Sequence, residues 1–217
     1  MIISRGRGYV FVHVPKTGGT ALALALEARA LKDDILIGDT PKARARRGRL
    51  KGMRAAGRLW KHSTLADIDG LLSGEDLAAL KVFTLVRNPW DRAVSYYHWL
   101  RGQGFAHPAV ALAKISDFSG FLNHPATRVS LAAAPYGRYV RDARGVERCA
   151  LFLRLERLEQ DLPRLEALLD LRLGPLARVN ASARGRDWRP YYSAADAELL
   201  ADIAAEDIAR FGYRFDP

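Results

Sequence analysis

The sequence predicts an α/β fold in which a central, mostly parallel sheet is covered by helices on both faces. Three short apolar segments, at residues 9–14, 81–86 and 149–155, are typical of buried strands. Each is followed by a longer segment with the composition or the amphipathic pattern of a helix. Strands that alternate with helices in this way indicate a parallel sheet and a three-layer architecture.

The first two predicted strands lead directly into helices. The strand at residues 9–14 runs into Pro15, and an Ala- and Leu-rich helix is expected at residues 20–31. The strand at residues 81–86 is followed by Pro89, which suits the first turn of a helix. We therefore expect an amphipathic helix from Pro89 to about residue 100.

Three further helices are expected. One covers residues 64–72 with Ser63 as its N-cap, and one follows the third strand as far as Asp170. The last covers residues 193–210, where apolar side chains recur at helical spacing.

The length and composition are those of one globular domain over residues 1–217. Of these residues 49% are hydrophobic and 27% are charged, enough for one substantial core. Cys149 is the single cysteine, which excludes an internal disulfide and fits a reducing compartment. The sequence shows no secretory signal and no run of roughly 18–20 apolar residues that would span a membrane. We expect a cytoplasmic protein.

Basic residues are concentrated in one stretch. The net charge is +10, and residues 41–61 hold nine Lys and Arg residues without an acidic residue. Such a stretch repels itself and attracts anions. One interpretation is a solvated, partly mobile insertion. The alternatives are a surface that binds a polyanionic acceptor, an anionic membrane surface or a nucleic acid.

A candidate anion-binding loop lies between the first strand and its helix. Residues 15–20 read Pro-Lys-Thr-Gly-Gly-Thr. The two glycines allow a sharp turn and a close approach of the backbone to a ligand. Free N–H groups at a helix start, aided by the helix dipole, bind anions, and the lysine and the threonine hydroxyls add a charge and donors. The alternative is a strand-to-helix turn without a ligand.

This loop differs from a Walker A loop. In a Walker A loop the lysine follows the last glycine, and the next Ser or Thr holds Mg²⁺; here Lys16 comes before the glycines. The second strand also ends in Arg87, where a Walker B strand would offer an aspartate. A metal-dependent P-loop kinase is therefore the weaker alternative. No His, Cys or carboxylate cluster has metal-ligand spacing, so no metal site is predicted.

A second candidate segment covers residues 84–95. Arg87 leaves the strand end, where open α/β sheets bind ligands. Ser95 lies two turns into the following helix and can face the same point. A guanidinium and a hydroxyl that converge there suit a phosphate monoester.

The two segments together resemble the PAPS-dependent sulfotransferases. Residues 12–20 (Val-His-Val-Pro-Lys-Thr-Gly-Gly-Thr) are similar to that family's 5′-phosphosulfate-binding loop. Residues 86–92 (Val-Arg-Asn-Pro-Trp-Asp-Arg) with Ser95 are similar to its 3′-phosphate-binding segment. The residues in these two segments are closest to the carbohydrate-type and bacterial branch of the family. Residues 153–162, 179–182 and 207–215 resemble the family more weakly.

The resemblance implies a P-loop-like sulfotransferase fold and a metal-free reaction. A sulfuryl group would move from 3′-phosphoadenosine-5′-phosphosulfate (PAPS) to an acceptor hydroxyl and leave adenosine 3′,5′-bisphosphate (PAP). The acceptor is expected to be a saccharide, and the basic stretch would suit an anionic saccharide. No nucleic acid is expected as a partner. The alternative from another class is a nucleic-acid or heparin-type binding module, which would bind polyanions with a steep salt dependence.

The resemblance also assigns residues to roles. Arg87 and Ser95 would hold the 3′-phosphate, and Ser182 lies in a region that approaches the nucleotide. Lys16 is the expected catalytic cation, which neutralises the leaving phosphate oxygen. The residues expected to hold the 5′-phosphosulfate are Lys16, Thr17, Gly18, Gly19, Thr20 and Ala21.

His62 is the candidate general base, because an acceptor alcohol must lose its proton. It lies in Trp60-Lys61-His62-Ser63-Thr64, where related enzymes often carry a histidine, and neighbouring cations would keep it neutral. The alternative is an ordinary loop histidine. His13 is expected to support the loop, and His98 is expected to be an exposed helical residue.

Overall fold

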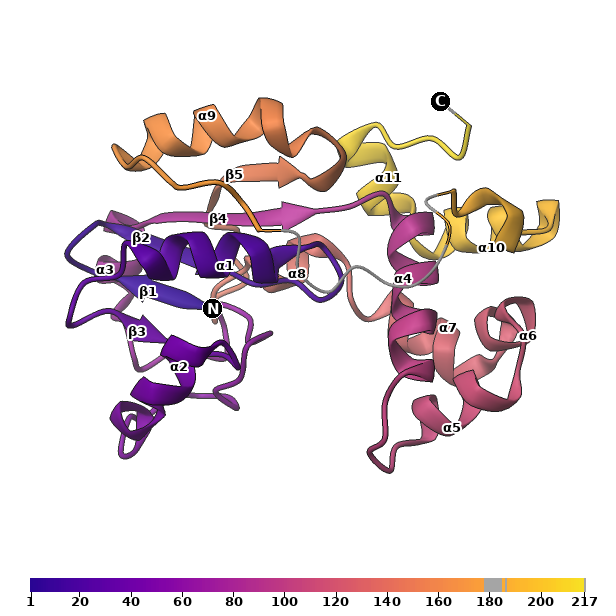
Figure 1. Ribbon diagram of the computed structural model, residues 1–217, viewed down its shortest axis with the longest axis horizontal. Coiled ribbons are helices and arrows are strands. Elements are labelled where there is room, and N and C mark those ends of the chain that lie inside the picture. The colour runs from indigo at the N-terminus through magenta and orange to yellow at the C-terminus, as the bar shows by residue number, and fades with distance from the viewer. Residues whose placement is uncertain (178–184, 186, 217) are drawn as a thin grey trace. The chain divides into compact units, whose positions relative to one another are not determined.

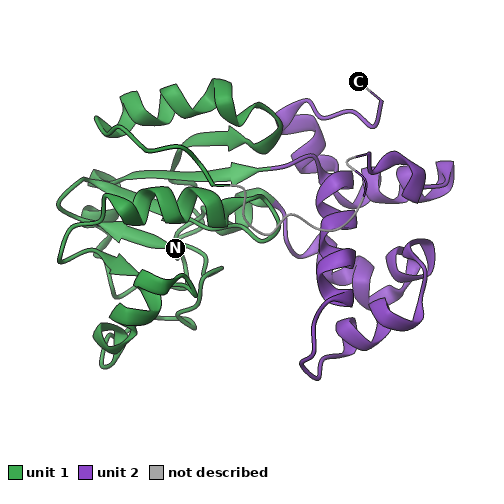
Figure 2. Ribbon diagram, viewed as in Figure 1, with its two compact units in different colours: residues 1–86, 136–180 green, residues 87–135, 181–217 purple. Residues whose placement is uncertain are grey.

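The structure is a computed structural model that describes residues 1–177, 185 and 187–216 (Figure 1). The chain divides into two compact units (Figure 2). Unit 1 comprises residues 1–86 and 136–180, and unit 2 comprises residues 87–135 and 181–217. The single domain over the whole chain stays a prediction, and each unit is described by itself.

Unit 1 is built on a five-stranded sheet with the order β3-β1-β2-β4-β5. Strands β2, β4 and β5 are mutually parallel, and β1 is antiparallel to both β2 and β3. This confirms the α/β fold with a mostly parallel sheet, and all three predicted strands are present. The strands are β1 (Ile2–Ser4), β2 (Tyr9–Val12), β3 (Ile35–Leu36), β4 (Lys81–Val86) and β5 (Cys149–Arg154).

Both faces of the sheet are buried, which explains why the strands are continuous apolar runs. Tyr9 and Phe11 of β2 belong to a core with Leu22 of α1 and Leu165 of α9. Val10 and the other alternate residues belong to a second core with α3 and the segment before it. The helical elements of unit 1 are α1 (Gly19–Ala28), α2 (Pro41–Arg46), η1 (Arg47–Leu50), α3 (Gly74–Ala79), α8 (Tyr136–Tyr139), η2 (Leu155–Arg157) and α9 (Leu158–Leu169).

Unit 2 is helical in its described part, and its core is rich in aromatic residues. Trp90, Val94 and Tyr97 on one face of α4 pack against Phe118 and Phe121 of α6. Asn88 caps α4 by accepting a hydrogen bond from the Trp90 N–H, and Pro89 occupies the first turn as predicted. The elements are α4 (Pro89–Arg101), α5 (Pro108–Ile115), α6 (Phe118–Asn123), α7 (Pro125–Ala132), η3 (Arg189–Tyr191), α10 (Ala194–Ile203) and α11 (Ala205–Phe211).

The predicted helix at residues 64–72 is wrong, because this segment forms a series of turns. Ser63 does not cap a helix; its hydroxyl accepts from the Trp60 N–H and lies within hydrogen-bond distance of the Arg58 and Trp60 carbonyls. The helix lies further on, where Ser73 and Asp76 form a capping box at the start of α3. The predicted helix at residues 193–210 is two helices, with a break at Ala204.

The first half of the basic stretch folds against the C-terminal end of α1. Thr40 caps α2 and donates to the Glu27 carboxylate at 2.7 Å. Lys42 and Arg46 donate to the carbonyls of Glu27 and Leu31 at 2.5 and 2.7 Å. Cations at this end of a helix stabilise it, because the last carbonyls carry partial negative charge. Across the described ranges, no helix is both long and apolar enough to cross a membrane.

Asp196 fastens α10 to α6 within unit 2. Its carboxylate is buried, and it accepts hydrogen bonds from Ser119, Asn123 and Ser193 at 3.1, 2.6 and 2.8 Å. Burial acts to raise the pKa of the Asp196 carboxyl, but these hydrogen bonds outweigh it and hold the pKa below its usual range.

We predict that Asp196→Ala lowers the free energy of unfolding by about 2–3 kcal/mol, because three donors lose their shared acceptor and α10 loses the N3 half of its capping box. Urea unfolding followed by circular dichroism measures the change. The control is Asp202→Ala, an exposed aspartate on the same helix, which we expect to cost less than about 0.5 kcal/mol. Equal losses in the two variants would contradict the role of Asp196.

Candidate functional site

The predicted anion-binding loop lies between the end of β2 and the start of α1. Gly18 is the N-cap residue of α1 and has a left-handed backbone with φ of 79°, which a glycine adopts at little cost. No side chain caps the helix. The first N–H groups of α1 therefore have no side-chain acceptor, and they lie at the positive end of the helix dipole. Such a helix start suits an anion.

Gly19 is required because the His13 ring lies against its backbone. A Cβ atom at residue 19 would come within 2.3 Å of His13 Cδ2 and 2.6 Å of Nε2, well inside contact distance. His13 is buried and stacks on Phe11 of β2. This agrees with the predicted supporting role of His13.

Lys16 and Thr17 shape the turn. Lys16 has a left-handed backbone with φ of 66°, a conformation that costs a non-glycine residue free energy and is often found at functional sites. Thr17 is fully buried, and its hydroxyl donates to the Val14 carbonyl at 2.9 Å. Since the hydroxyl has one proton, Thr17 uses it within the loop. The predicted donation by Thr17 to a ligand would need that bond to break.

His62 lies beside His13, and its hydrogen bond defines its tautomer. The Nδ1 atom of His62 is 2.7 Å from the His13 carbonyl oxygen. A carbonyl can only accept, so Nδ1 carries the proton and Nε2 of the neutral ring carries the lone pair. The two rings meet edge to face with centroids 4.9 Å apart. The structure thus brings His62 to the same place as the loop, as the base hypothesis requires.

The environment keeps both histidines neutral. Burial, and to a smaller extent the positive charge of Lys61, lower the pKa of His62 to about 4 against the opposing effect of the hydrogen bond to His13. Burial also lowers the pKa of His13 well below its usual range. A neutral His62 can accept a proton at Nε2 at physiological pH.

Arg87 and Ser95 lie in unit 2, on the segment that follows β4. Arg87 comes directly after Val86, the last residue of β4, and its guanidinium pairs with Asp91 at 2.7 Å. Asp91 lies in the first turn of α4, and Ser95 is a buried residue of the same helix. The ion pair orients the Arg87 side chain, and Nε also donates to Asp91 at 2.8 Å.

Two further residues singled out from the sequence, Ser182 and His98, add nothing to the geometry of the site. Ser182 lies outside the described residues. His98 is half-buried in unit 2, and its Nε2 lies 2.9 Å from the Tyr191 hydroxyl, so it has a structural contact and is not the exposed residue that was expected.

Two residues near the site were not singled out from the sequence. The Thr84 hydroxyl of β4 donates to the Val12 carbonyl at 2.7 Å and so fixes the end of β2, where the loop begins. Trp60 contacts the His62 ring edge to face, with centroids 5.1 Å apart. Neither role has a local sequence signal, because each depends on a contact between distant segments.

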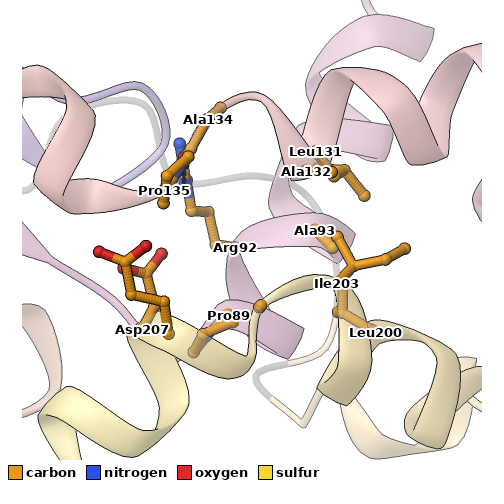
Figure 3. A pocket seen from close by; sticks show the side chains of 12 residues that line it. Pro89, Arg92, Ala93, Leu131, Ala132, Ala134, Pro135, Leu200, Ile203 and Asp207 are labelled. Atoms are coloured by element: carbon orange, nitrogen blue, oxygen red, sulfur yellow. Dashed lines mark hydrogen bonds between the residues drawn. The ribbon is translucent and has the colours of Figure 1, made fainter.

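A cavity of about 100 Å³ lies in unit 2 among α4, α7, α10 and α11 (Figure 3). Its wall is mostly apolar, and its charged residues are Arg92, Glu206 and Asp207. It contains none of the predicted site residues, so we assign no ligand to it. Within the described ranges, no group of three or more His, Cys, Asp or Glu side chains could hold a metal ion.

Comparison with known proteins gives a likeness in structure but no match in sequence. No protein-family model and no curated protein matches the sequence. The structure resembles the crystal structure of the mouse sulfotransferase SULT7A1 complexed with PAP, with a TM-score of 0.54 and 19% sequence identity. The match covers 93% of this chain and 84% of the mouse chain. The chain therefore has the fold of that sulfotransferase, as the sequence predicted.

We predict that Gly19→Ala lowers the free energy of unfolding by about 1–3 kcal/mol, because the new methyl group overlaps the His13 ring. The matched control is Gly74→Ala, since Gly74 is also the first residue of a helix and a Cβ there would meet nothing within 4 Å. We expect Gly74→Ala to be neutral or to stabilise the protein by up to about 1 kcal/mol. Thermal unfolding of both variants measures the difference, and similar effects would argue against the steric role of His13.

Proposed function

We propose that this chain is a sulfotransferase that moves a sulfuryl group from PAPS to an acceptor hydroxyl. The observation that carries the proposal is the loop before α1. It combines an uncapped helix start, a glycine forced by His13, a strained Lys16 and a neutral His62 in one part of unit 1. The fold of a mouse sulfotransferase crystallised with PAP supports the same function.

The donor would be held by two segments. The N–H groups at the start of α1, with Lys16, offer the 5′-phosphosulfate an anion site. Arg87 and Ser95 follow the end of β4 and would take the 3′-phosphate. Asp91 holds the Nε and Nη2 edge of Arg87 and so presets the direction of the guanidinium before the nucleotide arrives.

PAPS supplies a sulfuryl group on a good leaving group. The acceptor oxygen forms a bond to sulfur, and the bond from sulfur to the phosphate oxygen of PAPS breaks. The residues of the chain position the groups and balance the charge. The Lys16 ammonium neutralises negative charge on the leaving phosphate oxygen. The Nε2 atom of His62 takes the proton from the acceptor hydroxyl.

The low pKa of His62 affects this second role. At a pKa of about 4 the ring is neutral at physiological pH, but it is a weak base. Negative charge brought in by bound substrates would stabilise the protonated ring and raise that pKa. The base would therefore become stronger when the donor and an anionic acceptor are bound.

We further propose that the acceptor is a saccharide, because residues 12–20 and 86–92 resemble the carbohydrate-type branch of the family. A cytoplasmic location also stays a prediction. The role of Ser182 belongs to the same proposal, and it rests on the resemblance alone.

We predict that the protein binds PAP without Mg²⁺ in a calorimetric titration. Arg87→Ala should weaken PAP binding by about 100-fold, because a charge-assisted contact to phosphate is lost. Lys16→Ala should weaken it less than about 10-fold but lower kcat by about 10²–10³-fold, since Lys16 acts on charge that develops in the transition state. The control is Arg128→Ala, an exposed arginine of α7, which should bind PAP like the wild type.

Other results of this titration would contradict the proposal. Binding of ATP with Mg²⁺ alone would favour a P-loop kinase. Binding of neither nucleotide, together with salt-dependent binding of heparin, would favour a polyanion-binding module. Equal losses of affinity in Lys16→Ala and Arg87→Ala would contradict the assigned roles.

We predict that His62→Ala lowers kcat by about 10²–10⁴-fold while PAP affinity is retained, because the variant lacks a general base. The base is active in its neutral form, so the acidic limb of the kcat/KM profile should follow the free-enzyme pKa of about 4. The profile should then be flat from about pH 6 to 8 as far as this group is concerned. His98→Ala is the control and should keep kcat within a few-fold. An acidic limb near pH 6.5 would count against His62.

A further inference from the structure

A row of aromatic rings leads from the loop to the surface of unit 1. The His13 ring lies against Gly19, and the His62 ring meets the His13 ring edge to face. Trp60 meets His62 in the same way, with an interplanar angle of 87°. Trp60 is the outer member of the row, and 44% of it is exposed. A large aromatic side chain is thus open to a ligand beside the candidate base.

The charge around Trp60 is positive. The Arg58 guanidinium lies over one face of the Trp60 ring, 5.8 Å from its centre. Arg58 is exposed, and it has no ion pair with a carboxylate among the described residues. The sequence has no acidic residue from 40 to 66. Lys61, the next cation, is already paired with Asp39 at 2.7 Å. A negatively charged group at Trp60 would therefore find Arg58 as its partner.

We infer that Trp60 and Arg58 form an acceptor subsite for an anionic saccharide. The apolar C–H face of a sugar ring stacks on the indole face opposite Arg58, because the π face is negative and attracts those hydrogens. A carboxylate or sulfate on the sugar pairs with the Arg58 guanidinium. The sugar hydroxyls then lie next to His62. This inference rests on the proposed function, because the contact with His62 is what makes Trp60 part of an acceptor site.

The subsite can be tested by NMR on the ¹⁵N-labelled full chain. The four tryptophans give four indole N–H signals, and loss of one in Trp60→Phe assigns Trp60. The probes are a hyaluronan tetrasaccharide, which carries carboxylates, and fully N-acetylated chitotetraose, which is neutral. We expect the hyaluronan fragment to shift the Trp60 signal and to bind at least about 10-fold more tightly than chitotetraose. Trp60→Ala and Arg58→Ala should each raise the Kd for the hyaluronan fragment by about 10-fold.

Arg44→Ala separates a defined subsite from diffuse attraction. Arg44 is exposed on α2 in the same basic stretch, so it matches Arg58 in charge but does not contact Trp60. The Kd of Arg44→Ala for the hyaluronan fragment should stay within about two-fold of the wild-type value. Equal weakening by Arg44→Ala and Arg58→Ala would overturn the subsite in favour of general charge attraction. Equal binding of the neutral and the anionic sugar, or an unmoved Trp60 signal with both, would also overturn it.

A PAP titration of the same samples separates the two proposals. PAP binding with no response of Trp60 to either sugar overturns the subsite and leaves the sulfotransferase proposal standing. Absence of PAP binding overturns the sulfotransferase proposal, and the assignment of Trp60 to an acceptor site falls with it. PAP affinity that is unchanged in Trp60→Ala, together with weaker sugar binding, supports the subsite.

Discussion

The candidate site depends on the contact between the His13 ring and the backbone of Gly19. The ring occupies the space where any other residue would place its Cβ, so α1 must begin with glycine, and the helix start carries no side-chain cap. His13 also supports the candidate base, because its carbonyl holds Nδ1 of His62 and the two rings pack together. His13 thus helps to position both the candidate anion-binding end of α1 and the lone pair on Nε2 of His62.

The two ends of α1 differ in the side chains that meet their backbone groups. At the C-terminal end, Lys42 donates to the carbonyl of Glu27, and Arg46 donates to that of Leu31 just beyond the helix. These cations balance the negative end of the helix dipole. At the N-terminal end, Gly18 offers no side-chain acceptor. An anion that binds at the N-terminal end would complete the helix. Lys42 and Arg46 of the basic stretch therefore have a structural role, whereas exposed cations such as Arg44 and Arg58 stay open to a ligand.

The parts of the site with a local cause could be predicted from the sequence. The apolar strand β4 and the first-turn proline of α4 depend on neighbouring residues, and so does the glycine loop. The helix expected at residues 64–72 is absent because backbone groups of this segment bond outside it: the Leu65 N–H donates to the Tyr139 carbonyl, and the Asp67 carbonyl accepts from the Gly57 N–H. Thr64 and Asp67 exchange the backbone hydrogen bonds of a capping box, yet turns follow and Gly70 has φ of 90°. The strands β1 and β3 are too short to have a pattern of their own. The row of rings from His13 to Trp60 joins segments about fifty residues apart, so no spacing rule reveals it.

The burial that makes His62 available as a base also makes it weak. Removing the ring from water disfavours its charged form, which keeps Nε2 unprotonated, but a base with a pKa of about 4 has little affinity for the proton of an alcohol. The surroundings of the ring are mostly cationic, with Lys61 beside it and Arg58 beyond Trp60. Bound anions would cancel that charge and raise the proton affinity of Nε2. In the proposed mechanism, the charge of an anionic acceptor would therefore strengthen the candidate base.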